Sequence, residues 1–401
     1  MPPYNLPDPL VDESGKKIDA ETWNASRRGE VLDLFCENVY GVQPPRPEGM
    51  RWEVYERSGE AFGGKAIRKQ VKLFIQGDEA GPTLDLLMYL PKDLPEPAPV
   101  FLGLNFRGNH TIHADTAITL NSEWMRKGEG IVDHRATEAT RGTLAGRWPV
   151  ERILGRGFGV ATIYCGDIDP DFDDGFENGV HALYPDLQNR GDNFSTISAW
   201  AWGLSRAMDY LEEDEDVDHR RVAVLGHSRL GKTALWAGAT DERFAMVVSN
   251  NSGCGGAALS RRRFGETIER INTSFPHWFC ENHRRFNGNE DALPVDQHAL
   301  IALIAPRLVY VASASEDQWA DPFGEFLSAK EGSRVYELLG SEGIPEDAEW
   351  PAAGDHLHGE AVGYHLREGK HDVEEFDWDF YLSFAEERML PAERPKPGIS
   401  Q

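Results

Sequence analysis

The chain has 401 residues, of which 40% are hydrophobic and 27% are charged, a composition typical of a globular protein with a large core. Its net charge is -26, from 41 basic and 67 acidic residues. This charge argues against nucleic acid and against an anionic membrane surface as partners, because both bind basic faces. No stretch approaches 18 consecutive apolar residues, so the sequence predicts no transmembrane helix.

The cysteines are few and scattered. They are Cys36, Cys165, Cys254 and Cys280, and no two of them form a C-x-x-C pair. The sequence therefore predicts no zinc site and no disulfide scaffold, although it leaves one bridge among the four open.

The first 45 residues form a lead that is rich in proline and contains one amphipathic helix at about 22–40. Alternating apolar residues then predict two antiparallel strands at 68–77 and 82–91. Continuous apolar runs are typical of buried parallel strands. They occur around 98–110, 155–171, 219–228, 244–253 and 306–322. Helical spacing predicts helices at 193–213, 231–241 and 374–389.

From about residue 98 onward, strands and helices alternate, which predicts an α/β fold with a mostly parallel, twisted sheet covered on both faces. No interior linker is visible, so we expect a single catalytic domain over 1–401, with a long insertion at about 255–300. In such sheets the chemistry lies at the carboxyl ends of the strands. The polar residues that follow each apolar run are therefore the candidates for a site.

The first candidate is Ser228, which follows the apolar run "AVLGH" and precedes a predicted helix. In α/β hydrolases the motif G-x-S-x-G places a nucleophilic serine on a strained turn between strand and helix. Gly226 and Ser228 match this motif, but Leu230 occupies the second glycine position and Gly231 follows it. The local pattern leaves two interpretations open, a nucleophile or a serine whose side chain caps the helix.

A nucleophilic serine requires a base, and in this fold the chain order is serine, acid, histidine. His371 lies in a Gly-containing turn before the closing helix, which is the expected place for the base. His356, His358 and His365 are its rivals.

The acid should follow a late strand, where the sequence offers Glu316, Asp317 and Asp321. The other position for the acid, one strand earlier, holds Asn250 and Asn251, which carry no negative charge. This elimination favours the late loop, and Asp317 is the first choice within it.

An oxyanion requires preformed hydrogen-bond donors. Arg229 offers both a backbone N–H and a guanidinium next to Ser228, and "NFRGNH" adds Asn105, Arg107 and Asn109 after an earlier strand. The acidic loop at 167–177 does not match a calcium loop, because its glycine and glutamate are misplaced, so we interpret it as a polar loop. We expect no metal and no cofactor.

Several longer motifs resemble the glucuronoyl esterases of carbohydrate esterase family 15, particularly the bacterial branch. The resemblance covers nearly the whole chain, and its most specific part is "GHSRLGKTALWAGA" followed by "SNNSGCGGAALSRRRFGETIERIN". Further matching motifs are "FPHWF", "LPVDQHALIALIAPRLVYVASASEDQWADP" and "HDVEEFDW". The resemblance implies the α/β-hydrolase fold, a three-layer αβα sandwich.

The resemblance also implies a reaction, hydrolysis of the ester between a (4-O-methyl-)glucuronic acid branch of xylan and a lignin alcohol. By position, Ser228 matches the nucleophile, His371 the base and Arg229 the oxyanion residue. The family's residues that contact the glucuronate correspond in this chain to Lys232, Glu266 and Trp319. The family implies an exported protein, and we expect a monomer, although residues 1–17 show no signal peptide.

One position departs from the family pattern. Family members often carry the acid as a glutamate after the strand that here ends in "VVSNNSG", where this chain has asparagines. Some bacterial relatives resemble this chain in placing the acid on the later loop, at the position of Asp317. The departure therefore concerns which residue is the acid.

Two alternative functions remain open at this stage. One is an acetyl xylan esterase or general carboxylesterase, although an acetyl pocket does not need Lys232, Glu266 and Trp319. The other is a catalytically silent carbohydrate-binding protein on a hydrolase scaffold, which would not need to keep Ser228 and His371.

Overall fold

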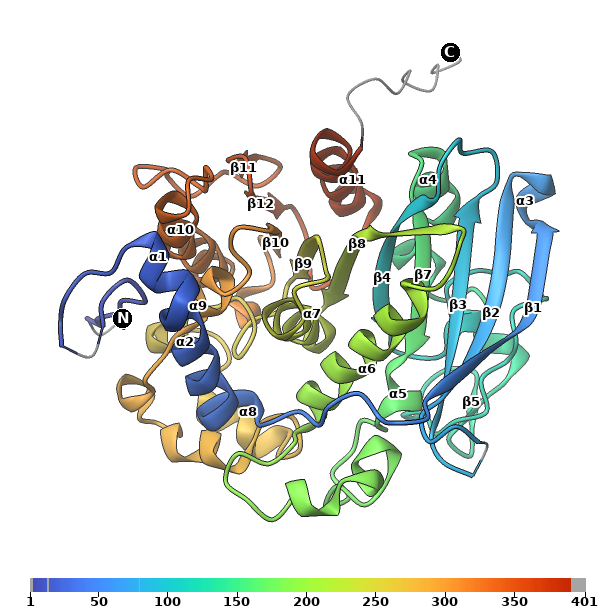
Figure 1. The fold of residues 1–401 in the computed structure, drawn as a ribbon, viewed down its shortest axis with the longest axis horizontal. Helices are drawn as coiled ribbons and strands as arrows, with labels where there is room; N and C mark the ends of the chain where they lie inside the picture. Colours follow the sequence, from blue (N-terminus) through green and yellow to red (C-terminus); the bar gives the residue numbers. More distant parts are fainter. Residues whose placement is uncertain (1–2, 13, 79, 391–401) are drawn as a thin grey trace. The chain divides into compact units, whose positions relative to one another are not determined.

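The computed structural model describes residues 3–12, 14–78 and 80–390 (Figure 1). The chain forms two compact units. Unit 1 comprises Met1–Pro44, Phe172–Trp202 and Leu225–Asp372, and unit 2 comprises Pro45–Asp171, Gly203–Val224 and Val373–Gln401. Helix α6, Thr196–Leu211, and strand β8, Val217–His227, have residues in both units. The expectation of one catalytic domain stays a prediction.

Unit 2 contains a mixed sheet in the order β1-β2-β3-β7-β4-β8. Its other strands are β1 (Arg51–Glu60), β2 (Ala66–Phe74), β3 (Thr83–Pro91), β4 (Ala98–Asn105) and β7 (Gly159–Tyr164). Strands β2 and β3 pair antiparallel, and β4 and β7 pair parallel, which confirms both sequence predictions. Every residue of β4 and β7 is buried, which explains their continuous apolar runs.

Strand β1 was not predicted, although it pairs antiparallel with β2. None of its residues is buried, and charged residues occupy much of it. An edge strand of this kind lacks the apolar signal that marks a strand in a sequence, and its pairing with β2 is what holds it in place.

Short elements complete unit 2. The helices are α3 (Ala61–Gly64), α4 (Val150–Gly155), α5 (Cys165–Ile168) and α11 (Glu375–Met389), and β5 (Ile131–Val132) pairs with β6 (Arg135–Ala136). Helix α11 begins with a capping box in which Glu374 and Asp377 accept each other's backbone N–H groups.

The turn after β4 holds three of the residues considered for an oxyanion site. The Asn105 amide donates to Asn109 Oδ1 at 2.7 Å and accepts the Gly108 N–H at 2.8 Å. Asn109 donates to the Asp85 carbonyl at 2.7 Å, and the Arg107 N–H donates to Asn105. The two asparagine side chains therefore stabilise the turn itself.

Unit 1 contains the strands β9 (Met246–Asn250), β10 (Leu308–Ala314), β12 (Val362–Arg367) and β11 (His356–His358), in this spatial order. Strand β10 pairs parallel with β9 and with β12, and β11 pairs antiparallel with β12 (Figure 1). Strands β11 and β12 were not predicted. Strand β12 is wholly buried, but it is short and contains Gly363, His365 and Arg367, which weaken its apolar signal.

Among the helices that lie wholly in unit 1, the sequence predicts those at 22–40 and 231–241 and misses those at 268–274, 297–302 and 322–338. The predicted helix at 22–40 is a continuous helical segment, in which α1 (Ala20–Thr22) and α2 (Arg28–Phe35) alternate with π-helical turns at Trp23–Arg27 and Cys36–Tyr40. The others are α7 (Arg229–Thr240), α8 (Ile268–Ser274), α9 (Gln297–Ala302) and α10 (Pro322–Leu338). Helix α7 packs on β9, and α10 packs on α9, β10 and β12 (Figure 1).

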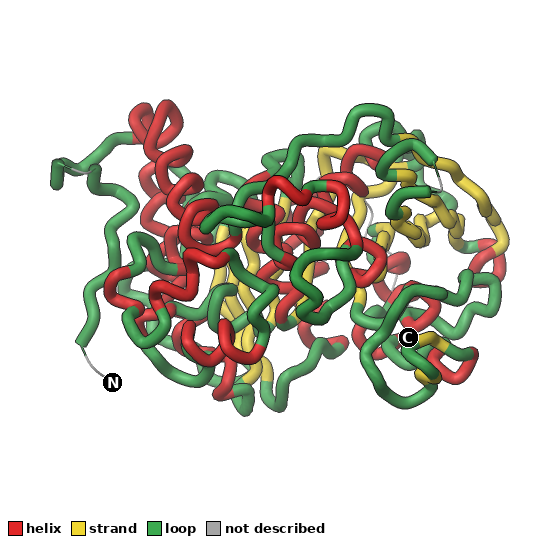
Figure 2. Tube along the Cα trace, turned by 90° about the horizontal axis from the view of Figure 1, so that it is seen from below, coloured by secondary structure: helices red, strands yellow, loops and turns green. Residues whose placement is uncertain are grey.

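Loops and short 3-10 helices, among them Ser260–Arg262 and Gln318–Ala320, make up much of the remaining chain (Figure 2). All four cysteines are free thiols. None of the helices in the described ranges combines the length and the apolar character that crossing a bilayer requires. Within residues 3–12, 14–78 and 80–390, no group of three or more His, Cys, Asp or Glu side chains is arranged to hold a metal ion.

Candidate active site

Ser228 lies on a sharp turn between β8 and α7. Its backbone angles are φ 59° and ψ -129°, a region that non-glycine residues rarely adopt and that costs about 1–3 kcal/mol. Gly226 makes the turn possible, because a Cβ atom there would lie 1.9 Å from the Leu230 carbonyl oxygen. Ser228 occupies the N-cap position, but its side chain makes no capping hydrogen bond. The alternative of a capping side chain is therefore wrong.

His371 and Asp317 are in direct contact. The Nδ1 atom of His371 lies 2.6 Å from Asp317 Oδ2, with side-chain exposures of 43% and 5%. An ionised carboxylate only accepts hydrogen bonds, so Nδ1 carries the proton. In the neutral ring this tautomer leaves Nε2 as a proton acceptor, which is the state that a general base requires.

The other candidate acids lie elsewhere. Glu316 is exposed, whereas Asp321 pairs with the buried guanidinium of Arg262 at 2.7 Å and caps helix α10. The geometry thus favours Asp317 among the three carboxylates of this loop.

The rival histidines are also placed apart from this pair. His356 and His358 are exposed on the short strand β11. His365 is buried in β12, where its Nδ1 lies 3.2 Å from the Tyr310 hydroxyl. His371 is the candidate whose ring nitrogen meets one of the candidate acids.

A second histidine links Ser228 to His371. The rings of His227 and His371 lie 4.4 Å apart between centroids, and His227 directly precedes Ser228. His227 Nδ1 lies 2.7 Å from Asn250 Oδ1, so its Nδ1 is the donor. This contact places the His371 ring next to the turn that carries Ser228, and the sequence analysis did not assign His227 a role.

Two further side chains hold the loop that carries His371. Asn251 donates to the Asp372 carbonyl at 3.2 Å and accepts the Ala314 N–H at 2.8 Å, which ties this loop to the end of β10. Arg367, 2% exposed, donates to the carbonyls of Glu368, Lys370 and Asp372.

Sequence reasoning treated Asn251 only as a failed acid and did not consider Arg367. An arginine at the end of an apolar strand, just before a glycine-containing turn, was the available signal for Arg367.

Arg229 is the first residue of α7, where backbone N–H groups have no acceptor within the helix. Its guanidinium lies 5.8 Å from the centroid of the Trp278 ring, a cation–π distance. The residue therefore carries a backbone donor directly after Ser228, while its positive charge lies over the Trp278 ring.

Lys232 is buried and donates to the carbonyls of Cys254, at 2.7 Å, and Ser252. These two carbonyls take two of the three donors of the ammonium group. Burial lowers the pKa of Lys232, and the negative charge of Glu266 opposes this shift. The structure thus gives Lys232 a role in holding the 252–254 loop, which the sequence analysis did not foresee.

Glu266 and Trp319 form the other side of this region. The Glu266 N–H donates to the Trp319 carbonyl at 3.0 Å, which joins the two segments that carry these residues. Burial raises the pKa of Glu266, while Lys232 acts in the opposite direction. Trp319 is 53% exposed, so its ring offers an open apolar face. The three residues assigned to glucuronate contact are therefore linked through Glu266.

A further carboxyl group, that of Glu325, is fully buried near the 252–254 loop. It accepts hydrogen bonds from the Gly253 N–H at 2.9 Å, from Ser252 at 3.2 Å and from Ser313 at 2.6 Å. Burial raises the pKa of Glu325 to about 8 from an ordinary value of 4.5, while these hydrogen bonds oppose the shift. Glu325 connects β10 to the same loop that Lys232 holds.

Glu325→Gln is expected to change how stability depends on pH. Between pH 5 and 9 the folded wild type binds the Glu325 proton more tightly than the unfolded chain, so its free energy of unfolding falls as pH rises. The glutamine variant lacks this decline. Urea unfolding should therefore show the variant gaining about 4 kcal/mol relative to wild type over this range.

Glu337→Gln, on the exposed face of the same helix, is the matched control and should follow the wild-type curve. Parallel pH curves for Glu325→Gln and wild type would contradict the assignment of a proton to Glu325.

Comparisons with known proteins agree with this geometry. A family model described as "Glucuronyl esterase, fungi" matches residues 158–340. The chain is 54% identical to carbohydrate esterase MZ0003, from an unknown prokaryotic organism, over 97% of this chain and 90% of that protein. It is 28% identical to the 4-O-methyl-glucuronoyl methylesterase of Schizophyllum commune, over 88% of this chain and 77% of that protein.

Solved structures show the same relationship. The glucuronoyl esterase from Solibacter usitatus is 46% identical, with a TM-score of 0.91 over 96% of this chain and 98% of that chain. A promiscuous esterase of carbohydrate esterase family 15 from a marine bacterial metagenome is 53% identical, with a TM-score of 0.90 over 97% and 98% of the two chains.

These similarities confirm the α/β-hydrolase fold, and they give no support to the alternative of a silent binding protein. Extensive identity to an esterase over nearly the full length accompanies a serine on a strained turn and a histidine–aspartate pair in one unit. The chain belongs to carbohydrate esterase family 15, the family of the glucuronoyl esterases, and is a carboxylic ester hydrolase.

Proposed function

We propose that the enzyme hydrolyses the ester between (4-O-methyl-)glucuronic acid of glucuronoxylan and an alcohol of lignin, through an acyl-enzyme on Ser228. The observation that carries the proposal is the contact of 2.6 Å between His371 Nδ1 and Asp317 Oδ2, next to the strained turn of Ser228. The family resemblance implies glucuronoxylan as the substrate class and an enzyme that is exported.

In the first step His371 Nε2 takes the proton of the Ser228 hydroxyl while the Oγ atom attacks the ester carbonyl carbon. Asp317 holds the imidazole in the required tautomer and stabilises the imidazolium that forms. His227, whose ring lies 4.4 Å from that of His371, supports the orientation of the base.

The negative charge that develops on the carbonyl oxygen requires donors that are already in place. Arg229 supplies them, through its backbone N–H at the start of α7 and through its guanidinium. Collapse of the tetrahedral intermediate breaks the bond to the alcohol oxygen, which takes the proton from His371. Water, activated by the same histidine, then releases the uronic acid from Ser228.

Recognition of the acyl part rests on Lys232, Glu266 and Trp319. The exposed indole of Trp319 offers an apolar platform to the face of a sugar ring, and the Glu266 carboxylate accepts hydrogen bonds from hydroxyl groups. Lys232, anchored by two carbonyls, adds a donor. The backbone hydrogen bond between Glu266 and Trp319 and the electrostatic interaction between Glu266 and Lys232 support the assignment of all three residues to one sugar.

A broader carboxylesterase activity is the second candidate. The observation that favours it is the relative from the marine metagenome, 53% identical, which is described as a promiscuous esterase. Activity on simple acetyl esters would accompany the glucuronoyl activity, because a small acyl group fits any site that accepts a larger one.

A substrate panel tests the proposal. Benzyl glucuronate should be hydrolysed with a kcat/KM well above that of para-nitrophenyl acetate. Trp319→Ala and Glu266→Gln should each lower kcat/KM on benzyl glucuronate by about 10- to 100-fold, since each removes a contact worth about 1–3 kcal/mol. Both variants should leave hydrolysis of para-nitrophenyl acetate nearly unchanged, because acetate has no ring to contact.

Steady-state kinetics on both substrates measures these effects. An equal loss on the two esters would assign Trp319 and Glu266 to the integrity of the site rather than to uronate binding. Activity confined to the acetyl ester would favour the general carboxylesterase.

A further inference from the structure

Three consecutive arginines lie in residues 260–266, here called the arginine segment, which also carries one of the proposed uronate contacts. Arg261 pairs with Asp296 at 3.2 Å, and Arg263 pairs with Glu290 at 2.8 Å. Both carboxylates belong to the chain just before α9. The first and third arginines therefore tie the arginine segment to that part of unit 1.

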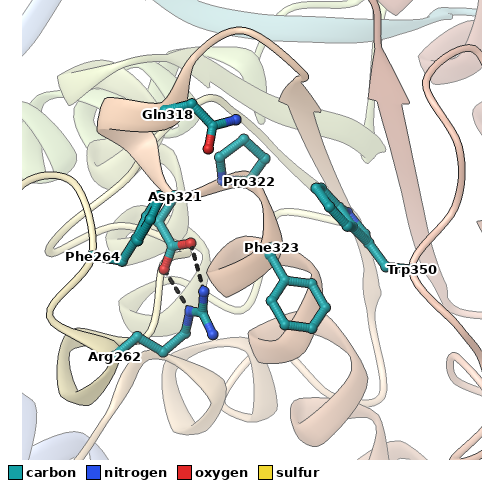
Figure 3. A pocket seen from close by; sticks show the side chains of 7 residues that line it. All are labelled: Arg262, Phe264, Gln318, Asp321, Pro322, Phe323 and Trp350. Carbon is teal, nitrogen blue, oxygen red and sulfur yellow. Dashed lines mark hydrogen bonds and ion pairs between the residues drawn. The ribbon is translucent and has the colours of Figure 1, made fainter. Parts of the chain in front are cut away.

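The middle arginine pairs instead with the end of residues 315–321, here called the acid turn. Arg262 donates to Asp321 through Nε at 2.7 Å and through Nη2 at 3.1 Å, a two-point contact that fixes the orientation of both side chains (Figure 3). The two side chains are 4% and 3% exposed. Loss of either partner would leave a buried charge without its counterion, so this pair is a strong constraint between the two segments.

The arginine segment and the acid turn meet a second time at the proposed uronate contacts. The Glu266 N–H donates to the Trp319 carbonyl at 3.0 Å. The backbones are close there, because a Cβ atom at Gly265 would lie 2.3 Å from the Trp319 carbonyl oxygen. The two segments are thus joined by a buried ion pair at one point and by a backbone hydrogen bond at another.

The first half of the acid turn is held by different contacts. The Ser315 N–H donates to the Arg367 carbonyl at 2.8 Å, and the Glu316 N–H donates to the Gly369 carbonyl at 2.9 Å. Asp317, which follows them, contacts the proposed base. The ion pair at the end of the acid turn can therefore be weakened while the proposed acid stays in place.

We propose that the ion pair between Arg262 and Asp321 is a positioning device for recognition of the uronate. It aligns Glu266 with Trp319, and so determines how strongly the enzyme prefers a glucuronoyl ester to an acetyl ester. This inference rests on the proposed function and deepens it. Two side chains from separate segments can contact one sugar ring only when the segments are held in a fixed relative position.

Arg262→Lys tests the inference. Lysine keeps the positive charge but replaces the planar two-point donor by a single ammonium group. KM for benzyl glucuronate should rise by about 3- to 10-fold, because misaligned contacts retain only part of their binding energy. The value of kcat should change by less than about twofold, since the acid and the base are held separately. Hydrolysis of para-nitrophenyl acetate should be unchanged, because acetate has no ring to contact.

Arg263→Lys is the matched control, because it makes the same change one residue later in a pair with Glu290 rather than with the acid turn. It should keep the wild-type KM. Asp321→Asn is the second test variant. Asparagine tolerates the left-handed backbone of this position, with φ 54°, and keeps an oxygen that can accept the Gly324 N–H, but it lacks the charge. It should raise KM for benzyl glucuronate as Arg262→Lys does.

Urea unfolding of every variant identifies the conditions under which all of them are folded, and the kinetics are measured there. A wild-type KM for benzyl glucuronate in both Arg262→Lys and Asp321→Asn would overturn the inference. An equal rise in KM for para-nitrophenyl acetate, or a loss of kcat, would also overturn it, because the pair would then support the site as a whole.

A combined variant shows whether the pair acts through the two contacts. In a Trp319→Ala and Glu266→Gln background, addition of Arg262→Lys should lower kcat/KM on benzyl glucuronate by less than about twofold, because the side chains that it aligns are absent. A further loss as large as that in the wild-type background would place its effect elsewhere and overturn the inference.

A direct measurement separates this inference from the proposed function. In protein labelled with fluorotryptophan, the fluorine NMR resonance that disappears in Trp319→Phe belongs to Trp319. It should shift or broaden in Arg262→Lys and Asp321→Asn and stay unchanged in Arg263→Lys. If the wild type hydrolyses no glucuronate ester, the proposed function fails, and this resonance alone decides whether the pair positions Trp319. An unchanged resonance in both test variants would overturn the inference even where the esterase activity is present.

Discussion

Ser228→Ala is expected to reduce kcat on benzyl glucuronate by about 10⁴-fold or more, since removal of the nucleophile from a serine hydrolase leaves only the contribution of the oxyanion donors and of binding. The serine has a strained backbone with φ 59° and no capping role, so its side chain contributes little to the fold. Chain stability should therefore change by about 1 kcal/mol or less. Steady-state kinetics and urea unfolding of the same preparation measure both quantities.

Ser274→Ala is the matched control, because Ser274 is an exposed serine at the end of α8 in the same unit. It should retain the wild-type rate. A residual rate within tenfold of wild type in Ser228→Ala would place the nucleophile on another residue and remove the proposed mechanism.

Asp317→Asn should lower kcat by about 10³- to 10⁴-fold with a small effect on KM, as replacement of the buried aspartate does in other serine hydrolases. The carboxylate accepts the His371 Nδ1 proton at 2.6 Å. An asparagine at this position presents an N–H group to Nδ1 and favours the opposite tautomer, in which Nε2 carries the proton. The base then cannot take the proton of Ser228, although the shape of the site is preserved.

Glu316→Gln provides the comparison for this variant, since it makes the same chemical change one residue earlier on an exposed side chain. It should change kcat by less than about twofold, in line with the small effects of surface substitutions. Near wild-type activity in Asp317→Asn would show that another group orients the imidazole. A similar loss of activity in both variants would show that the substitutions disturb the loop that carries these residues, and would not identify Asp317 as the acid.

Much of the fold and part of the site could be predicted from sequence. Strands β4, β7, β9 and β10 are buried almost throughout, so each has a continuous apolar run that marks it in the sequence. The strained turn at Ser228 could also be found from the sequence. The backbone can turn there only if a small residue, Gly226, stands two positions before the serine. Such features are local, and a local pattern of residues is enough to specify them.

Strands β1, β11 and β12 could not be predicted, since their stability comes from pairing with a neighbouring strand rather than from their own apolar content. The choice of acid was open for a related reason. Glu316, Asp317 and Asp321 lie within six residues of one another, and only the folding of the 368–372 loop brings His371 to Asp317.

The supporting residues were the least visible in the sequence. Asn251 and Arg367 act through hydrogen bonds to the carbonyls of the loop that carries His371, and Glu325 acts through groups more than ten residues away along the chain. Residue type and position along the chain are enough to identify Ser228 as the candidate nucleophile and His371 as the candidate base. The hydrogen bonds of Asn251 and Glu325 join distant segments, so these partners are decided only when the strands are aligned in the folded protein.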